Sequence, residues 1–296
     1  MRKNPMVWDD APAEGVLSPL DRDPLASDDM PSLLGLPDGQ GMLGARQGAT
    51  VDGEASADVH TVFETVKAAL AQVVQHNRAS RVDLDHLTDK DLELLKDALG
   101  AGEVSVLLHG GPDDENEAQI LETALPGVWV GRADNADGSV QTHWLEVADA
   151  PFALRRLAVE RPQKALDVAA LDAPRGAMNV MGVLAEIAER SAAWQPGDES
   201  HVINFTLFPM SAADSAFLSK TLGEVGVQVM SGGYGVARVV MTAVPNVWAV
   251  QFLNGMGTTI LDTIEIGDVP SCVLASKEDF EDSLSRLADI QSAYLQ

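Results

Sequence analysis

The sequence predicts an α+β protein made of two tandem related repeats, each with helices followed by an antiparallel β-meander, behind a disordered acidic N-terminal tail. Three observations support this: the same order of helical and strand patterns occurs twice, residue blocks match between the two copies, and the composition changes near residue 57. We therefore divide the chain into a tail (1–57), a first repeat (58–151), a basic linker (152–176) and a second repeat (177–296).

The tail differs from the rest of the chain in composition. Residues 1–57 contain 6 of the 15 prolines, and 10 acidic against 4 basic residues, so their net charge is −6. No helical or strand period is found there, which predicts an extended or disordered segment. Its one apolar cluster, residues 30–37, is expected to pack on the chain's own body or, alternatively, on a partner.

The first repeat begins with a helix and continues into strands. Apolar residues from Val59 to Val74 recur with the i, i+3, i+4, i+7 spacing of one helix face. Thr88 and Asp91 form a capping signature for a second helix, which ends at Gly100. Four strand-like runs follow: residues 104–108, a stretch ending at Leu125, residues 128–130 and residues 140–147.

The second repeat shows the same order. A helix is predicted from Val180 to Trp194, and Ser211 with Asp214 caps another that ends at Gly223. Strands are predicted at 225–230, 236–244, 247–253 and 258–266. A final helix starts at Ser276 and Asp279.

The two copies also match residue by residue, at offsets of 119 to 123 positions. The paired blocks, in unchanged order, are Leu99-Gly100 with Leu222-Gly223, His109-Gly110-Gly111 with Ser231-Gly232-Gly233, Thr123 to Pro126 with Thr242 to Pro245, Val128-Trp129 with Val247-Trp248, and Glu146 to Pro151 with Glu265 to Pro270. This period exceeds that of solenoid repeats and indicates a domain-sized duplication. The matched tryptophans and glycines are interpreted as core anchors and turns.

Composition excludes several classes of function. A net charge of −25 disfavours nucleic acid, because phosphate binding needs a basic face. One cysteine, Cys272, excludes a disulfide framework and an iron–sulfur cluster held by this chain alone. No secretory signal and no membrane span is found, so we expect a cytoplasmic location.

Residue patterns that carry chemistry are missing. There is no G-x-S-x-G elbow, and the six histidines lack metal-ligand spacing, so no catalytic residue, metal site or cofactor is predicted. Cys272 lies in an apolar stretch and is expected to be buried and inert. Residues 152–176 have a net charge of +2, which is expected to balance the acidic surface internally or, alternatively, to contact an acidic partner.

The second repeat resembles the HupH/HyaF/HoxQ family of hydrogenase expression/formation proteins. The resemblance rests on residues 204–209 (Asn-Phe-Thr-Leu-Phe-Pro), Gly233-Tyr234-Gly235 with Arg238, Val247-Trp248 with Phe252 and Asn254, residues 260–266, and Asp268-Val269-Pro270. It is strong over residues 200–290 and looser over the first repeat. The family pattern commonly continues with Asn-Cys-Arg after Gly-Tyr-Gly, whereas this chain reads Val236-Ala237-Arg238.

The resemblance implies a non-catalytic chaperone that binds the iron–sulfur small-subunit precursor of a [NiFe]-hydrogenase before twin-arginine export. It further implies a thioredoxin-like companion maturation factor as a second partner. Tyr234, Arg238 and Asn254, near the second hairpin, are the candidate partner-binding residues and are expected to be exposed. The alternative is a metal or cluster carrier, or a thiol-handling enzyme, in the same maturation process.

Overall fold

The computed structural model describes residues 55–109, 117–134, 140–161, 165–208, 210–232 and 236–294. Within these ranges the chain forms six α-helices, ten β-strands and two short 3₁₀ turns. The predicted disordered tail, apart from its last residues, and the turns at 110–112 and 135–138 lie outside the described residues. The helical chain starts earlier than the predicted boundary, because Ser56 already caps the first helix by accepting from the N–H of Val59.

Each half of the described chain follows the same order of elements: helix, strand, helix and four strands. The first half consists of α1 (Ala57–His76), β1 (Ser80–Asp83), α2 (Asp89–Leu99), β2 (Val104–Leu108), β3 (Glu117–Glu122), β4 (Val128–Asp134) and β5 (Val140–Val147). The second half consists of α4 (Val180–Ala193), β6 (His201–Asn204), α5 (Ala212–Leu222), β7 (Val227–Ser231), β8 (Val236–Met241), β9 (Val247–Leu253) and β10 (Thr259–Ile266). The predicted duplication of helices and meander therefore appears in the structure, with one short strand, β1 or β6, added to each half.

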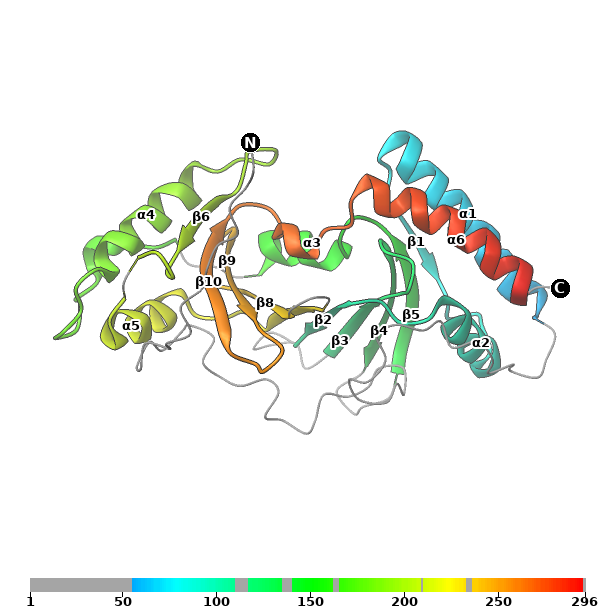
Figure 1. Cartoon of the computed structure of the whole chain (residues 1–296), viewed down its shortest axis with the longest axis horizontal. Helices are drawn as coiled ribbons and strands as arrows, with labels where there is room; N and C mark the ends of the chain where they lie inside the picture. Colours follow the sequence, from blue (N-terminus) through cyan, green and yellow to red (C-terminus); the bar gives the residue numbers. More distant parts are fainter. Residues whose placement is uncertain are drawn as a thin grey trace.

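The ten strands form one antiparallel sheet in the order β1-β5-β4-β3-β2-β7-β8-β9-β10-β6. Equivalent strands lie at equal distances from the β2–β7 pair, where Val106 lies opposite Val229. The halves are thus related by an approximate two-fold axis through this pair. In Figure 1 the helices gather at the two ends of the curved sheet, with α3 (Phe152–Glu160) between them.

The two faces of the sheet belong to different apolar clusters, because successive side chains of a strand point to opposite faces. Trp129 and Trp248, at equivalent positions, are fully buried in a central cluster that α3 covers. Their neighbours Val128 and Val247 face the helices of their own halves. The complete burial of two large aromatic side chains makes the duplicated motif an important part of the core.

In each half one aspartate, Asp91 or Asp214, joins the first two helices, and the two residues occupy equivalent positions of the duplicated motif. Asp214 is fully buried, and its Oδ1 accepts the N–H groups of Met178, Asn179 and Val180 at 2.8, 3.0 and 3.0 Å, which caps α4. Its Oδ2 accepts from the N–H and the hydroxyl of Ser211 at 2.9 and 2.7 Å, which completes a capping box on α5. Burial alone would raise the pKa of Asp214, but these hydrogen bonds outweigh it and hold the pKa well below its usual range.

Asp91 plays the corresponding part in the first half. Hydrogen bonds from the hydroxyl of Thr88, and then from Ser56 at the start of α1, lower its pKa. Thr88 caps α2 as predicted, and the helix ends at Gly100 with φ of 63°. The two capping signatures read from the sequence therefore also fix how each pair of helices meets.

The last helix, α6 (Lys277–Tyr294), follows the second half in sequence but packs on the first. Phe280 and Leu287 are buried among residues of α1 and α2, and Figure 1 shows α6 beside α1. Gln291 donates to Glu64 of α1 at 2.9 Å. The predicted helix is confirmed, while its docking on the other half was not anticipated. None of the described helices is long and apolar enough to cross a bilayer.

Candidate functional site

The three predicted contact residues lie in different settings. Tyr234 is outside the described residues. Arg238 lies on β8 opposite Met230 and Gln251 of the flanking strands and is only 4% exposed, so the expectation that it is exposed is wrong. It lies on the same face of β8 as Val240, which packs in the apolar cluster with α4 and α5. A role of Arg238 in partner binding stays a prediction.

Asn254 shapes a turn at the end of β9. Its Oδ1 accepts the N–H groups of Met256 and Thr258 at 2.9 and 3.0 Å, and its own N–H donates to the carbonyl of Thr258 at 2.9 Å. This asparagine therefore presents Met256, which is highly exposed at the tip of the β9–β10 hairpin. Contact between Asn254 and a partner stays a prediction.

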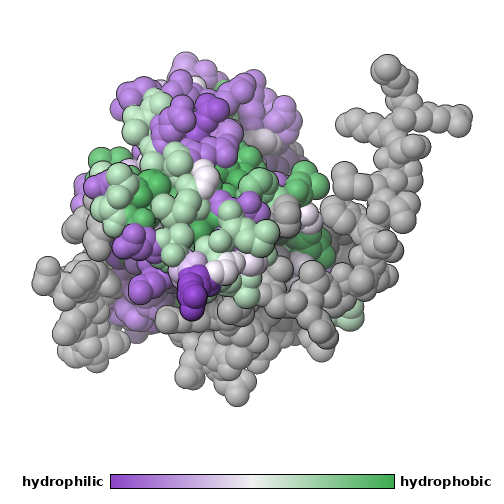
Figure 2. All heavy atoms as spheres, turned by 90° about the vertical axis from the view of Figure 1, so that its left-hand side faces the viewer, coloured by the Kyte–Doolittle hydropathy of each residue, from purple (hydrophilic) through white to green (hydrophobic). Residues whose placement is uncertain are grey.

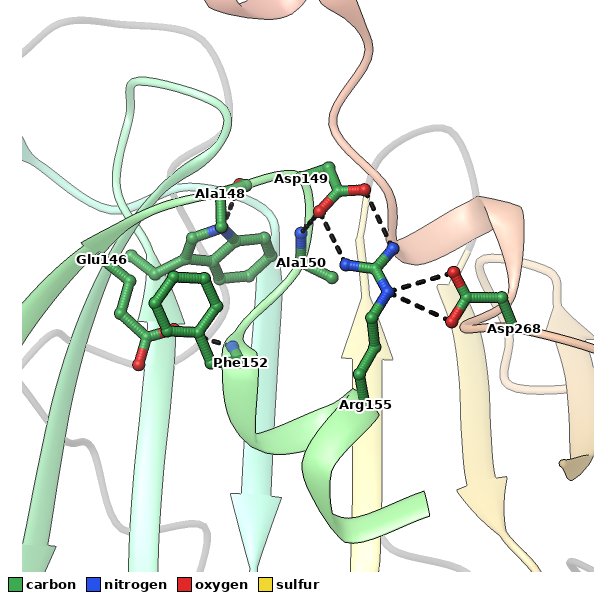
Figure 3. Close-up of polar contacts among 8 residues, drawn as sticks. Glu146, Ala148, Asp149, Ala150, Phe152, Arg155 and Asp268 are labelled. Atoms are coloured by element: carbon green, nitrogen blue, oxygen red, sulfur yellow. Dashed lines mark hydrogen bonds and ion pairs between the residues drawn. The ribbon is translucent and has the colours of Figure 1, made fainter. Parts of the chain in front are cut away.

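The predicted basic linker contains a polar junction between the two halves. Arg155 of α3 donates from both terminal nitrogens to Asp149, at 2.7 and 2.9 Å, and from Nε to Asp268, at 3.0 and 3.1 Å. Figure 3 shows this guanidinium between the two carboxylates. Asp149 and Asp268 are equivalent residues of the duplicated motif, so one arginine on the connecting helix ties both copies together. Their hydrogen bonds and charges raise the pKa of Arg155.

A second arginine of this segment has the same effect. Arg161 donates to the carbonyl oxygens of Val225 and His109, which belong to different halves. Arg155 thus balances acidic charge within the chain, as the first interpretation of the segment expected, and Arg161 joins the two halves. The sequence patterns did not predict that α3 is helical, although Leu154 of this helix is completely buried.

The outer end of the second half carries the largest group of exposed apolar side chains in the described chain. We define the outer apolar edge as Val202 of β6, Leu207 and Phe208 directly after it, Met256 of the β9–β10 turn and Ile260 of β10. Leu207 and Met256 are more than four-fifths exposed. Figure 2 views this end of the molecule, where hydrophobic residues spread across the middle of the face and hydrophilic ones lie above them.

The backbone at this end is also open to pairing. β6 is the last strand of the sheet and pairs only with residues 263–266 of β10. After β6 the chain turns, since the N–H of Leu207 donates to the carbonyl of Asn204, so residues 259–261 have no described strand on their outer side. An apolar strand edge of this kind is a template for another extended segment. Leu207 and Phe208 belong to the stretch that carries the resemblance, but they were not among the contact residues predicted from the sequence.

Cys272 offers little nucleophilic chemistry. It is partly buried in the 3₁₀ turn η2 (Ser271–Val273), where burial and then the charge of Glu265 raise the pKa of its thiol to about 11. The thiolate is the reactive form, so this cysteine is almost entirely protonated at neutral pH. This agrees with the expectation of an inert thiol.

No group of three or more metal-ligating side chains comes together among the described residues. Two of the histidines pair singly with glutamates: His109 lies 3.1 Å from Glu117, and His201 lies 2.7 Å from Glu186. Both pairs are about one-third exposed or more, and a single carboxylate–imidazole contact is an ordinary surface ion pair.

The outer apolar edge, by contrast, has a geometry suited to binding another polypeptide.

These observations define a class: a protein built by duplication of one α+β unit, with a continuous sheet and an open apolar edge. The model of the family "HupH hydrogenase expression protein, C-terminal conserved region" matches this chain twice, at residues 57–163 and 177–294. The chain belongs to the HupH/HoxQ/HyaF family of hydrogenase expression/formation proteins. Each matched range contains one structural half, and the first also includes α3 while the second also includes α6.

Several curated relatives are named as hydrogenase expression/formation or hydrogenase operon proteins. The hydrogenase expression/formation protein HupH of Rhizobium leguminosarum bv. viciae is 45% identical over 72% of this chain and 73% of its own length. HoxQ of Cupriavidus necator is 38% identical, covering 78% and 79%. The hydrogenase-1 operon protein HyaF of Escherichia coli is 31% identical, covering 75% and 79%.

Proposed function

We propose that this chain is a non-catalytic assembly chaperone that binds the iron–sulfur small-subunit precursor of a [NiFe]-hydrogenase before its twin-arginine export. The observation that carries this proposal is the outer apolar edge, an exposed binding surface on a chain that belongs to a hydrogenase expression/formation family. A holding function needs such a surface together with a stable scaffold, and the shared sheet supplies the scaffold.

The charge of the chain supports a basic client. With 45 acidic and 20 basic residues, the chain carries −25, so its surface attracts a basic segment and repels acidic ones. A twin-arginine export signal is such a basic segment by definition. A thioredoxin-like companion would act on the same client, and the raised thiol pKa of Cys272 leaves redox chemistry to that companion.

Co-purification tests the proposal. The tagged chain is co-expressed with the small-subunit precursor, with and without its export signal, and with the companion factor. We expect recovery of the precursor, and weaker recovery as salt rises from 50 to about 500 mM, because screening weakens charge attraction. Failure to recover the precursor in every combination would refute the proposal.

The metal-carrier or thiol-enzyme alternative makes different predictions. It requires bound metal in the purified chain, measured by elemental analysis, or loss of hydrogenase maturation in a Cys272→Ala variant. Metal-free protein that supports maturation after Cys272→Ala would eliminate that alternative.

A further inference from the structure

The approximate two-fold symmetry provides an internal comparison of the two ends of the sheet. At the first end, Arg81 of β1 lies opposite Glu146 of β5, and at the second end Val202 of β6 lies opposite Glu265 of β10. Glu146 and Glu265 are equivalent residues of the duplicated motif. Arg81 and Val202 therefore occupy the same position in the two sheet edges.

At the first end the carboxylate is fully satisfied within the chain. Glu146 is 1% exposed and accepts from the indole N–H of Trp144 at 2.8 Å, from the N–H of Phe152 at 2.8 Å and from Arg81 at 3.5 Å. The guanidinium of Arg81 also lies 4.3 Å from the centre of the Trp144 ring. Figure 3 shows Glu146 directed at the backbone of Phe152. A charged side chain on an edge strand also discourages pairing with another chain.

At the second end none of these partners is present. Val202 stands in place of Arg81, Thr263 in place of Trp144, and among the described residues no side chain or N–H donates to the Glu265 carboxylate. Glu265 is nevertheless half-buried, and burial raises its pKa. Beside this carboxylate, Val202 is 50% exposed. The second edge thus has an acidic side chain beside the half-exposed Val202.

We infer that the outer apolar edge with Glu265 is the docking site for an extended segment of a partner protein in which apolar residues alternate with arginine. The segment pairs with the outer side of β6 and places an arginine on the sheet face that Val202 shares with Glu265, so that its methylene stem covers Val202 and its guanidinium reaches Glu265, as that of Arg81 reaches Glu146 in the first half. This inference rests on the proposed function and names the part of the chain that receives the client.

Other occupants fit less well. Residues 1–54 of this chain carry 10 acidic and 4 basic residues, so like charge disfavours their docking on Glu265. A second copy of β6 would place His201, Val202, Ile203 and Asn204 against themselves, and this strand contains no arginine or lysine. A basic partner segment is the occupant that satisfies both the carboxylate and the apolar side chains.

The test uses two synthetic ten-residue probes, one alternating valine with arginine and the other valine with glutamate, and measures their binding to the full chain by fluorescence anisotropy at 50 mM salt. We expect the arginine probe to bind and the glutamate probe not to bind. Glu265→Gln should weaken the arginine probe by about tenfold, since it removes one charge-assisted hydrogen bond. Val202→Arg should abolish binding, because the new guanidinium pairs with Glu265 as Arg81 pairs with Glu146.

Val159→Arg is the matched control, because it makes the same change at an apolar residue that is 81% exposed on α3, away from the edge. Circular dichroism and thermal unfolding establish that each variant is folded. Equal binding of both probes, or equal losses in Val202→Arg and Val159→Arg, would overturn the inference. So would sedimentation showing a dimer that only Val202→Arg dissociates, since a second copy would then occupy the edge.

Co-purification of the small-subunit precursor separates this inference from the proposed function. Recovery with Val159→Arg but not with Val202→Arg supports both. Recovery with every variant keeps the proposed function and refutes the docking site. Specific binding of the arginine probe without recovery of the precursor keeps the docking site and refutes the proposed client.

Discussion

Replacing Glu122 by glutamine should stabilise the chain above neutral pH and leave its stability near pH 4.5 unchanged. Glu122 ends β3, is 8% exposed and accepts the N–H of Gly127 at 3.0 Å, and a backbone hydrogen bond from Glu103 contributes less than that from Gly127. Burial raises the pKa of this carboxyl to about 7, against an ordinary value of 4.5. The equivalent residue of the second half is Met241, a member of the central apolar cluster. The position therefore favours a neutral side chain.

The sign of the effect follows from proton binding. Between pH 4.5 and 7 the folded chain keeps the Glu122 proton that the unfolded chain has released, so the free energy of unfolding falls as pH rises. Each pKa unit corresponds to about 1.4 kcal/mol, so the full cost above pH 8 is about 3 kcal/mol. Glutamine keeps the acceptor for the Gly127 N–H and carries no charge, so this cost disappears.

The assay is urea unfolding, followed by tryptophan fluorescence, at several pH values from 4.5 to 8.5. The difference between Glu122→Gln and the wild-type chain should grow from near zero to about 3 kcal/mol across this range. Glu93→Gln, on the exposed side of α2, is the control and should give no such trend. A constant difference for Glu122→Gln at all pH values would refute the reasoning.

Three further predictions concern the joints of the fold and its thiol. Asp214→Ala removes the acceptor of five described hydrogen bonds at two helix starts and should lower the free energy of unfolding in urea at pH 7 by about 3 kcal/mol. The control Asp198→Ala affects one exposed turn and should lower it by less than about 1 kcal/mol. Similar losses for both variants would contradict the capping role of Asp214. Arg155→Leu should lower the protection of the α3 amides against hydrogen exchange more than Arg156→Leu does. The loss in free energy of unfolding should stay at about 1 kcal/mol, because the paired side chains are more than one-third exposed. Unchanged exchange would show that the junction does not hold α3. Cys272 should react with iodoacetamide at pH 8 about 100-fold more slowly than in the urea-unfolded chain, because its thiol pKa rises from 9.0 to about 11; equal rates would exclude the raised pKa.

The parts of the fold that the sequence predicts are those encoded by local signals. α2 and α5 begin and end where Thr88, Gly100, Ser211 and Gly223 place them. Capping and turn residues act within a few positions of the chain, so they can be read without knowing the rest of the fold. The tryptophans of the duplicated motif are buried as interpreted, because large apolar residues at matched positions have few alternatives to the core.

The parts that the sequence does not predict depend on residues far apart in the chain. β1 and β6 have only four residues each, too few to show an alternating pattern, and exist because β5 and β10 offer them an edge. The fusion of both meanders into one sheet depends on the pairing of β2 with β7 across more than a hundred residues. Arg238 was expected at the surface because arginine usually is, but it lies on the sheet face where Val240 packs with α4 and α5.

The binding surface was only partly predictable for the same reason. Leu207 and Phe208 lie in a recognisable stretch, whereas the exposure of Val202 and Ile260 depends on β6 being the last strand of the sheet. The lack of a described cationic partner for Glu265 is recognised only when Val202, which lies opposite it, is compared with Arg81, which lies opposite Glu146 in the other half. Such a comparison needs the registers of both edges, which no sequence pattern supplies.

The position of α6 has a consequence for biosynthesis. This helix follows the second half in the chain, yet Phe280 and Leu287 complete the core of the half that is made first. The first half therefore keeps an open apolar face until α6 has been synthesised, and its core is completed only after the second half has been made. Loss of α6 would thus damage the fold of the half that precedes it by more than a hundred residues.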